Sequence, residues 1–452
     1  MLSLQNTGLH MQRRINNIYI ESLGCARNLV DSELMLGKLV DAGYNIVVDP
    51  AKARTILINT CSFIEAAINE SIDTILELAK YKRNGKCRRI IVAGCLPERF
   101  REKIIKTLPE VDFFLGTGAY SKIVQAIEGI PIASGILLPD PGLTLLNYSA
   151  EPRIRSVPYM AYLKIAEGCN RRCTYCIIPK LRGKQRSREI EDVVSEAKVL
   201  IESGVKELIL VAQDTSSYGK DLGNSVNLAK LIERISDLSD DIWIRILYGH
   251  PESIEADAIK AIASAENVCS YFDIPIQHAS SKILKRMGRN YNQTKLLKLF
   301  DKIRSTDPDA VLRTTVITGF PGETDKDFGE LLSFIEKIKF DHLGAFVYSD
   351  SKDIVSHKLS DKVRKNVAKK RYERIMSCQM EISSQNNRRH IGKVFDVLVE
   401  ESPEEKLYIG RTKYQAPDVD GITYISGEMK TGSLVRTKIT DALEYDLVGE
   451  PA

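Results

Sequence analysis

Short apolar runs alternate with helical patterns along the first 128 residues, and no other feature limits the possible folds as strongly. Each run has strand character, and the first three are each followed by a segment with apolar residues at helical spacing. This rhythm is typical of a doubly wound parallel α/β domain, which we predict for residues 16–128. The four predicted strands cover residues 17–24, 55–60, 89–94 and 112–118.

The same rhythm resumes between residues 155 and 385 with six further strands. Six strand–helix units in a row predict a partial (βα)6 barrel, in which the active residues follow the C-terminal ends of the strands. A proline-rich stretch over residues 129–154 is the predicted linker between the two domains. The six strands are predicted just before Cys169 and at residues 207–214, 242–249, 271–277, 311–320 and 342–350.

A third pattern of short strands separated by Gly, Pro and Asp turns predicts a small antiparallel β-barrel over residues 388–452. A basic helical stretch at residues 361–390 precedes it, with a packed apolar face and a solvated charged face. From Ile391 onward the chain carries seven Lys and Arg against twelve Asp and Glu, a net charge of about −5.

The composition is that of a globular protein with several domains. Its 452 residues exceed one typical core, and a net charge of +4 over this length predicts neither nucleic-acid nor membrane binding. No run of about 18 apolar residues is present, so no membrane-spanning helix is expected. The N-terminal residues lack the apolar core of a secretory signal, and we expect a solvated tail and a cytoplasmic location.

Nine cysteines are present, and their odd number argues against a disulfide framework. Three of them, Cys25, Cys61 and Cys95, directly follow the first three predicted strands. The C-terminal ends of parallel strands share one edge of an open sheet, so these cysteines are predicted to converge there. Three independent buried cysteines are the alternative. Cys87 lies in a polar stretch before its strand and is excluded.

A second group of cysteines has the spacing CxxxCxxC in EGCNRRCTYC, just past the first strand of the predicted barrel. Cys169, Cys173 and Cys176 can hold three corners of an iron–sulfur cluster, which Cys thiolates bind. A structural zinc site needs a fourth ligand. Cys269 or His278 is imaginable in that role, although nothing in the sequence places either beside the loop.

The CxxxCxxC loop after the first strand of a βα barrel resembles the radical S-adenosylmethionine (SAM) enzymes. In that superfamily the fourth iron of a 4Fe–4S cluster is left open for SAM, whose reductive cleavage yields a 5′-deoxyadenosyl radical. With the three strand-end cysteines added, the chain is similar to the methylthiotransferases from about Asn17 to Gly449. The resemblance implies a radical-generating cluster on the loop cysteines, an auxiliary 4Fe–4S cluster on the strand-end cysteines, and a TRAM domain for the C-terminal barrel.

Several stretches resemble the branch of this family that modifies an aspartate of small-subunit ribosomal protein S-twelve. They are SLGCARNLVDSE (22–33), NTCSFIEAAINESID (59–73), EGCNRRCTYCIIPKLRG (167–183) and GRTKYQAPDVDG (410–421). Ser62 stands where that branch would have Gly, which leaves the ligand count unchanged. The acidic C-terminal barrel independently favours a basic protein over RNA, because RNA-binding modules neutralise phosphates with Lys and Arg. A merely solvated acidic surface is the alternative.

For this branch the resemblance implies that one SAM donates a methyl group to sulfur at the auxiliary cluster. A second SAM provides the radical that removes hydrogen from the β-carbon of the aspartate, giving 3-methylthioaspartate. A flavodoxin-like or ferredoxin-like electron donor is required. Two rivals remain: a tRNA adenosine methylthiotransferase, which should have a basic barrel, and a non-catalytic iron–sulfur scaffold or RNA-binding protein.

Contacts to SAM are predicted near the C-terminal ends of the barrel strands, through side chains that end strands and through glycines that permit close backbone approach. The candidates are Tyr175, Gln213, Gln277, Gly319 and Gly322. Packing of Tyr175 against its loop is one alternative, and a plain turn capped by Thr324 is the alternative for the TGFPGET motif. The basic segment RGKQRSR (182–188) is interpreted as a solvated helix entry, or else as a contact to a carboxylate of SAM or substrate.

Overall fold

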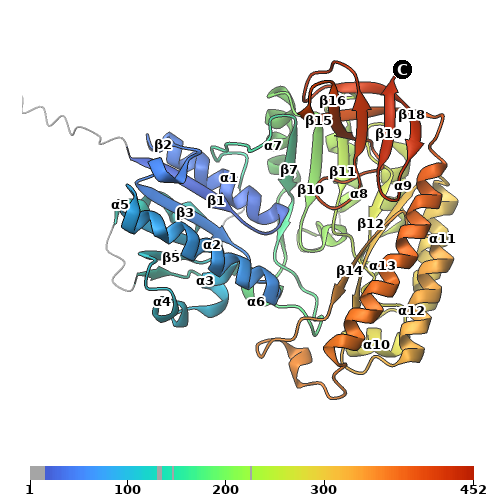
Figure 1. The fold of residues 1–452 in the computed structure, drawn as a ribbon, viewed down its shortest axis with the longest axis horizontal. Helices are drawn as coiled ribbons and strands as arrows, with labels where there is room; N and C mark the ends of the chain where they lie inside the picture. The colour runs from blue at the N-terminus through green and yellow to red at the C-terminus, as the bar shows by residue number, and fades with distance from the viewer. Residues whose placement is uncertain (1–15, 130–134, 145–146, 224–225) are drawn as a thin grey trace, which may run out of the picture. The chain divides into compact units, whose positions relative to one another are not determined.

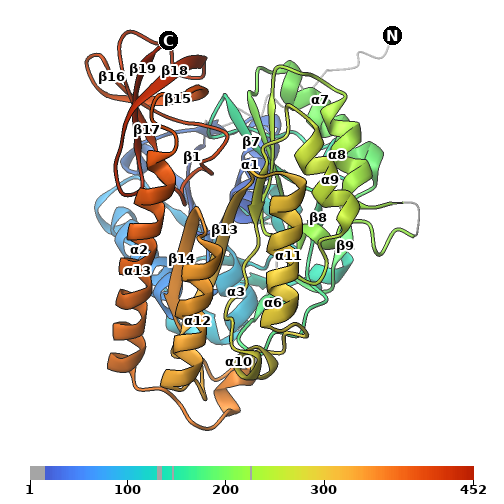
Figure 2. The same cartoon turned by 90° about the vertical axis from the view of Figure 1, so that its right-hand side faces the viewer.

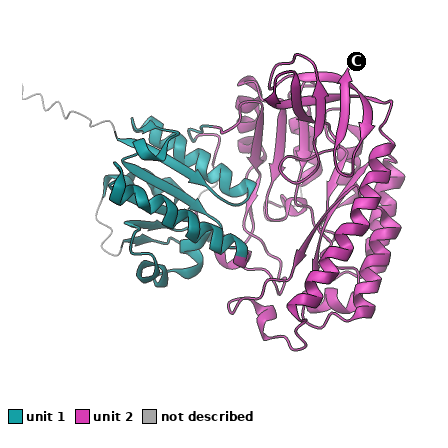
Figure 3. Ribbon diagram, viewed as in Figure 1, with its two compact units in different colours: residues 1–62, 66–143, 151–154 teal, residues 63–65, 144–150, 155–452 magenta. Residues whose placement is uncertain are grey.

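The computed structural model describes residues 16–129, 135–144, 147–223 and 226–452, and the chain separates into two compact units (Figure 3). Unit 1 comprises residues 1–62, 66–143 and 151–154, and unit 2 comprises residues 63–65, 144–150 and 155–452. The tail predicted before Asn16 and part of the predicted linker lie outside the described residues. Within the described residues, no helix is long and apolar enough to cross a membrane.

A six-stranded sheet with the order β2-β1-β3-β4-β5-β6 forms the centre of unit 1 (Figure 1). Every pairing is parallel, as predicted for a doubly wound domain. The central strand β3 is buried along its whole length, as expected for a sheet covered on both faces. The strands are β1 (Asn17–Ser22), β2 (Asn45–Ile46), β3 (Thr55–Thr60), β4 (Arg89–Gly94), β5 (Phe113–Leu115) and β6 (Ile136–Leu137).

The helices of this sheet follow the predicted rhythm with two differences. A further helix, α5, follows β5, where none was predicted. The single helical segment expected after β4 is two short helices, because Arg101 between them has a left-handed φ of 52°. The helices are α1 (Ala26–Asp41), α2 (Glu65–Asn84), α3 (Cys95–Phe100), α4 (Lys103–Thr107) and α5 (Ile123–Glu128).

The central part of unit 2 contains two three-stranded parallel sheets, β11-β10-β7 and β12-β13-β14. A bridge between Ile244 and Val268, and a hydrogen bond from the Gly249 amide to the Asp273 carbonyl (2.8 Å), join them. The six strands therefore follow chain order around a partial (βα)6 barrel, as predicted. They are β7 (Met160–Lys164), β10 (Glu207–Val211), β11 (Trp243–Ile246), β12 (Tyr271–Asp273), β13 (Val311–Thr318) and β14 (His342–Val347).

Helices cover the outside of this partial barrel (Figure 2). One face of α8 packs on the barrel, since Leu231, Ile232 and Ile235 are fully buried. A short pairing of β8 (Ala166–Glu167) with β9 (Arg186–Ser187) encloses the CxxxCxxC segment. The helices are α6 (Ile178–Arg182), α7 (Ile190–Glu202), α8 (Leu228–Ser236), α9 (Ala256–Ser264), α10 (Ser281–Arg286), α11 (Gln293–Thr306), α12 (Asp325–Ile338) and α13 (Lys365–Arg388).

The C-terminal strands close into a five-stranded barrel in the order β15-β16-β17-β19-β18. Its pairings are antiparallel as predicted, except that β17 and β19 run parallel. The strands are β15 (Val394–Glu404), β16 (Leu407–Arg411), β17 (Thr423–Ser426), β18 (Leu434–Ala442) and β19 (Leu447–Pro451).

The end of β16 and the segment that follows it attach this barrel to the N-terminal ends of the core strands. Arg411 forms a buried ion pair (2.6 Å) with Glu207, the first residue of β10. Asp420 accepts a hydrogen bond from Tyr271, the first residue of β12, and forms an ion pair with Arg313 (3.2 Å). The acidic barrel therefore lies at the end of the core opposite to the C-terminal strand ends.

Candidate iron–sulfur and SAM site

The three strand-end cysteines follow neighbouring strands of the sheet in unit 1. Cys25 is the N-cap of α1 after β1, Cys61 follows β3, and Cys95 opens α3 after β4. Because β1, β3 and β4 are adjacent and parallel, the three cysteines lie at the same sheet edge, where the sequence predicted them. Cys25 and Cys61 are partly exposed, and Cys95 is 9% exposed.

A glycine allows the first two of these cysteines to approach each other. Gly24 has a φ of 94°, and a Cβ atom added there would lie 2.7 Å from the Cβ atom of Cys61. Only a residue without a side chain fits this conformation and this distance. A glycine directly before the cysteine recurs at Cys95 and Cys169, whereas Thr60 precedes Cys61, so the Gly–Cys pair marks some but not all of the strand-end cysteines.

Hydroxyl groups fix the backbone around this triad. Ser71 Oγ donates to the Cys61 carbonyl (2.8 Å) and accepts from the Cys61 amide (3.2 Å). Ser62, at the position where Gly was expected, is buried and donates to the Cys95 carbonyl (2.9 Å). Sequence reasoning missed Ser71, whose one signal is its place on the buried face of α2. Cys87 lies at the other end of β4, where its Sγ donates to the Arg89 carbonyl (3.3 Å).

The CxxxCxxC loop packs between two other segments of unit 2. Gly168 has a φ of 83°, and a Cβ atom added there would lie 2.1 Å from the Lys184 carbonyl oxygen. The Cys169 amide donates to the Gly183 carbonyl (3.1 Å), and on the other side the Thr174 amide donates to the Met287 carbonyl (2.9 Å). Contacts with the protein alone therefore fix the backbone of the loop.

Two thiols of this loop, those of Cys169 and Cys176, need a positive partner to ionise. Burial raises the pKa of the Cys169 thiol, and it raises the pKa of Cys176 to about 12, with further increases from Cys173 and Cys169. An iron–sulfur cluster supplies such a partner and binds thiolates. Within the described ranges, no group of three or more His, Cys, Asp and Glu has the geometry for a single metal ion. An iron–sulfur cluster binds each thiolate on a different iron, so its ligands lie farther apart than those of a single ion. The three loop cysteines fit such a cluster.

Neither imagined fourth ligand completes a zinc site. Cys269 is fully buried just before β12, at the end of the core opposite to the loop, and its amide donates to the Ile244 carbonyl (2.8 Å). His278 Nδ1 accepts from the Ser280 amide (2.9 Å), and its Nε2 lies 3.9 Å from a Glu323 carboxylate oxygen. The three loop thiols thus have no protein side chain as a fourth ligand in the part of the chain that the structure describes.

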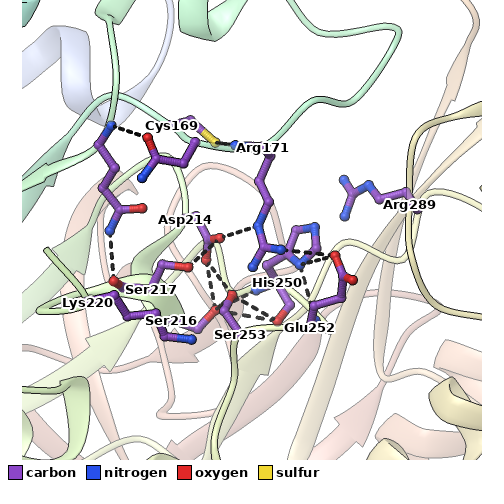
Figure 4. Close-up of polar contacts among 12 residues, drawn as sticks. Cys169, Arg171, Asp214, Ser216, Ser217, Lys220, His250, Glu252, Ser253 and Arg289 are labelled. Carbon is purple, nitrogen blue, oxygen red and sulfur yellow. Dashed lines mark hydrogen bonds and ion pairs between the residues drawn. The ribbon is translucent and has the colours of Figure 1, made fainter. Parts of the chain in front are cut away.

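An ion-pair network anchors the loop to the strand ends (Figure 4). Arg171 Nε lies 2.9 Å from Asp214, just past β10, and Arg171 Nη1 lies 3.0 Å from Glu252. Asp214 also accepts from Ser217 Oγ (2.7 Å) and Ser253 Oγ (2.8 Å). A cavity of about 420 Å³ borders this network. The arrangement fixes the backbone between the first two loop cysteines.

A second buried network lies directly before the loop. Glu167 Oε2 lies 2.9 Å from Lys164 Nζ and 3.3 Å from Arg182, and Glu167 Oε1 accepts from the Gln213 amide nitrogen. Burial opposes ionisation of Glu167, but Lys164 and Arg182 outweigh it and hold its pKa below the usual value. The solvated reading of the basic segment is wrong for Arg182 and Arg188, because both are buried in ion pairs.

The structure places the candidate SAM contacts after the C-terminal ends of β7, β10, β12 and β13. Tyr175 OH accepts from Arg289 (2.5 Å), and its ring packs edge-on against Phe320 at 6.4 Å between centroids. Gln213 is bound to Glu167. Gln277 has a φ of 65°, and its backbone pairs with β13. Contact of these side chains with SAM stays a prediction.

Packing accounts for part of the TGFPGET motif. A Cβ atom added at Gly319 would lie 2.3 Å from the Cβ atom of Ala368 in α13, and the Gly319 amide donates to Glu323 (2.6 Å). The Gly322 amide donates to the Asp361 carbonyl (2.8 Å). The alternative role of Thr324 is confirmed, since it forms a capping box at α12. Close approach of this turn to SAM remains a prediction.

Three known families match successive parts of the chain. Residues 17–116 match the uncharacterized protein family UPF0004, residues 163–335 match the radical SAM superfamily, and residues 391–451 match the TRAM domain.

Curated relatives match over nearly the full chain. A protein of Desulfosudis oleivorans named ribosomal protein uS12 methylthiotransferase RimO is 51% identical over 96% of this chain and 99% of its own length. A protein of Clostridioides difficile with the same name is 45% identical over 96% of this chain and 98% of its own length.

Solved structures show the same fold at low identity. The radical SAM methyltransferase TsrM from Kitasatospora setae superposes with a TM-score of 0.54 at 13% identity, covering 73% of this chain and 72% of TsrM. The cobalamin-dependent radical SAM enzyme OxsB gives a TM-score of 0.51 at 13% identity, covering 82% of this chain and 56% of OxsB.

Proposed function

The chain belongs to the RimO family of radical SAM methylthiotransferases, and we propose that it replaces a hydrogen on the β-carbon of an aspartate of ribosomal protein uS12 with a methylthio group. The product is 3-methylthioaspartate. Relatives of that name, at 45% identity and above over 96% of the chain, support the substrate. The alternative substrate, a tRNA adenosine, is not favoured.

One structural observation carries the proposal: two separate sets of three cysteines lie at C-terminal strand ends of parallel sheets. Cys25, Cys61 and Cys95 would hold an auxiliary 4Fe–4S cluster. The cysteines of the CxxxCxxC loop would hold the radical-generating 4Fe–4S cluster. Bound there, the clusters and SAM supply the one-electron chemistry and the methylated sulfur that an unactivated C–H bond requires.

The side chains of the chain hold and shield this chemistry. Glu167, directly before the loop, and Arg171, between its first two cysteines, tie this part of the loop to the core through ion pairs with Lys164 and Asp214. No general acid or base is proposed for C–H cleavage, because the ordinary pKa values of carboxylates and imidazoles are far below that of the β-carbon. Orientation and exclusion of water are the contributions of the protein.

The acidic barrel supports a basic protein partner. Glu401, Glu404 and Glu405 are exposed on it, and such a field steers a positively charged partner more than it adds affinity. Because the barrel is attached at the N-terminal ends of the core strands, it would bind a part of uS12 away from the target aspartate. RNA binding by this barrel is not proposed. A flavodoxin-like or ferredoxin-like protein would supply the electrons.

Anaerobic reconstitution tests the proposal. The chain should hold about eight irons, cleave SAM reductively and add a methylthio group to uS12. Single Cys→Ala changes at Cys61 and Cys173 should each remove about four irons and abolish product. A chain that binds about one zinc and does not cleave SAM would be a scaffold and not this enzyme.

A further inference from the structure

Arg289 is buried without a carboxylate partner among the described residues. Six arginines are buried in those ranges, and the other five form ion pairs with Asp or Glu. Those five are Arg182, Arg188, Arg245, Arg371 and Arg411. Arg289 is 8% exposed, and its guanidinium donates to two tyrosine hydroxyls. A buried charge without a counter-ion is costly, so this position needs an explanation.

The two phenols orient the guanidinium but do not neutralise it. Tyr175 OH accepts from Arg289 Nη2 at 2.5 Å and Nε at 3.2 Å, and Tyr291 OH accepts from Nη1 at 3.1 Å. An ordinary phenol ionises near pH 10, and burial raises the pKa of Tyr291 to about 12, so neither hydroxyl supplies a negative charge near pH 7. Tyr291 OH donates in turn to the Ile276 carbonyl (2.9 Å), which fixes its orientation.

The guanidinium lies directly behind the CxxxCxxC loop. Tyr175 stands between Cys173 and Cys176 in the sequence. Met287 lies in the turn that leads to Arg289, and its carbonyl accepts a hydrogen bond from the Thr174 amide (2.9 Å). Arg289 Nη2 lies 2.5 Å from the hydroxyl of Tyr175, a residue of the loop itself. The unpaired cation is therefore placed next to the negative charge that a cluster on this loop would carry.

The other groups around Arg289 supply no negative charge in its place. His250 is 5% exposed, and its Nδ1 accepts from the Glu252 amide (3.2 Å), which fixes a neutral ring. Burial, Arg289 and Arg171 hold the pKa of His250 far below its usual value. The Glu252 carboxylate is paired with Arg171 at 3.0 Å (Figure 4).

We propose that Arg289, held by Tyr175 and Tyr291, is the counter-charge of the cluster bound by the CxxxCxxC loop and raises its reduction potential. The proposal rests on the proposed function, since it requires that cluster. An electron added to the cluster adds negative charge, and a fixed cation in a water-poor site stabilises the reduced form more than the oxidised form. Arg289 acts through its charge and its position, without ligating iron.

The test is a potentiometric titration, followed by electron paramagnetic resonance and without SAM. The parent is the full-length chain with Cys25, Cys61 and Cys95 changed to Ala, so that one cluster of about four irons remains. Arg289→Gln removes the charge and keeps hydrogen bonding to the phenols. It should lower the reduced-to-oxidised ratio at fixed potential at least about tenfold, a shift of about 59 mV in midpoint. Arg289→Lys and Tyr291→Phe keep the charge and should change the ratio by less than about threefold.

The midpoint potential and the iron content of the variants decide whether the charge of Arg289 acts on the cluster. An Arg289→Gln protein with the iron content and midpoint of the parent overturns the proposal. If Gln prevents cluster loading while Lys permits it, the charge is required and the proposal stands. If both variants lose iron, the shape of the guanidinium and not its charge is what matters, and the proposal is wrong. A parent without iron overturns the ligand assignment itself, which separates failure of the proposed function from failure of this inference.

Discussion

The buried ion pairs between the core and the C-terminal barrel should be essential to the stability of unit 2. Glu207 is fully buried, and its two carboxylate oxygens lie 2.7 Å from Arg245 and 2.6 Å from Arg411. Glu207→Gln keeps the volume of the side chain but leaves Arg245 without a carboxylate partner among the described residues, while Arg411 retains Glu400 (2.6 Å). Breaking a buried pair in this way costs about 3–5 kcal/mol.

For a unit of this size, that cost corresponds to a fall of about 6–10 °C in melting temperature. Differential scanning calorimetry of the anaerobic holoprotein measures it. Glu191→Gln is the matched control, since Glu191 makes the same type of contact with Arg234 (2.9 Å) but both side chains are about half exposed or more. If Glu207→Gln had the same melting temperature as the wild type and the control, the stability of the barrel would not depend on these ion pairs.

Three further changes test other parts of the structure. Gly24→Ala should lower the iron content from about eight to about four per chain, because the new Cβ atom would crowd Cys61; Gly204→Ala, at the same φ of 94° but with nothing within 4 Å, should keep it. Burial lowers the pKa of His278 to about 3, below its unfolded value of 6.5, so the unfolded state binds more protons and stability falls as the pH drops through this window. Urea unfolding should show that the free energy of unfolding falls by about 1 kcal/mol between about pH 7 and about pH 5.5, and His278→Asn should not show this fall. The same pH dependence in the wild type and the variant would contradict the buried neutral ring. The triple change of Glu401, Glu404 and Glu405 to Gln should raise KM for uS12 at low salt and leave SAM cleavage unchanged, and an equal effect on both would argue against recruitment by charge.

The sequence predicts the layers and the six cysteines because both depend on local pattern. Apolar runs separated by helical spacing identify parallel strands, and parallel strands bring their C-terminal ends to one edge, so the sequence alone places Cys25, Cys61 and Cys95 at that edge. The acidic barrel could be recognised from its short strands and charge.

Contacts between distant segments were not predictable from these patterns. Arg289 lies 113 residues after Cys176 in the sequence, and nothing local marks it as the partner of Tyr175. The segment RGKQRSR looked solvated because its charges are dense, yet Arg182 and Arg188 are buried by carboxylates from the preceding strand and the following helix. The attachment of the C-terminal barrel depends on pairs such as Arg411 with Glu207, 204 residues apart.

The central claim is that the chain adds a methylthio group to an aspartate of uS12. Mass spectrometry of uS12 and of tRNA, after incubation with the reconstituted protein, SAM, reductant and a sulfur source, tests it most directly. The account predicts one methylthio group in place of one hydrogen on a uS12 aspartate and no change in tRNA. An unmodified uS12 together with a methylthio group on a tRNA adenosine would contradict it.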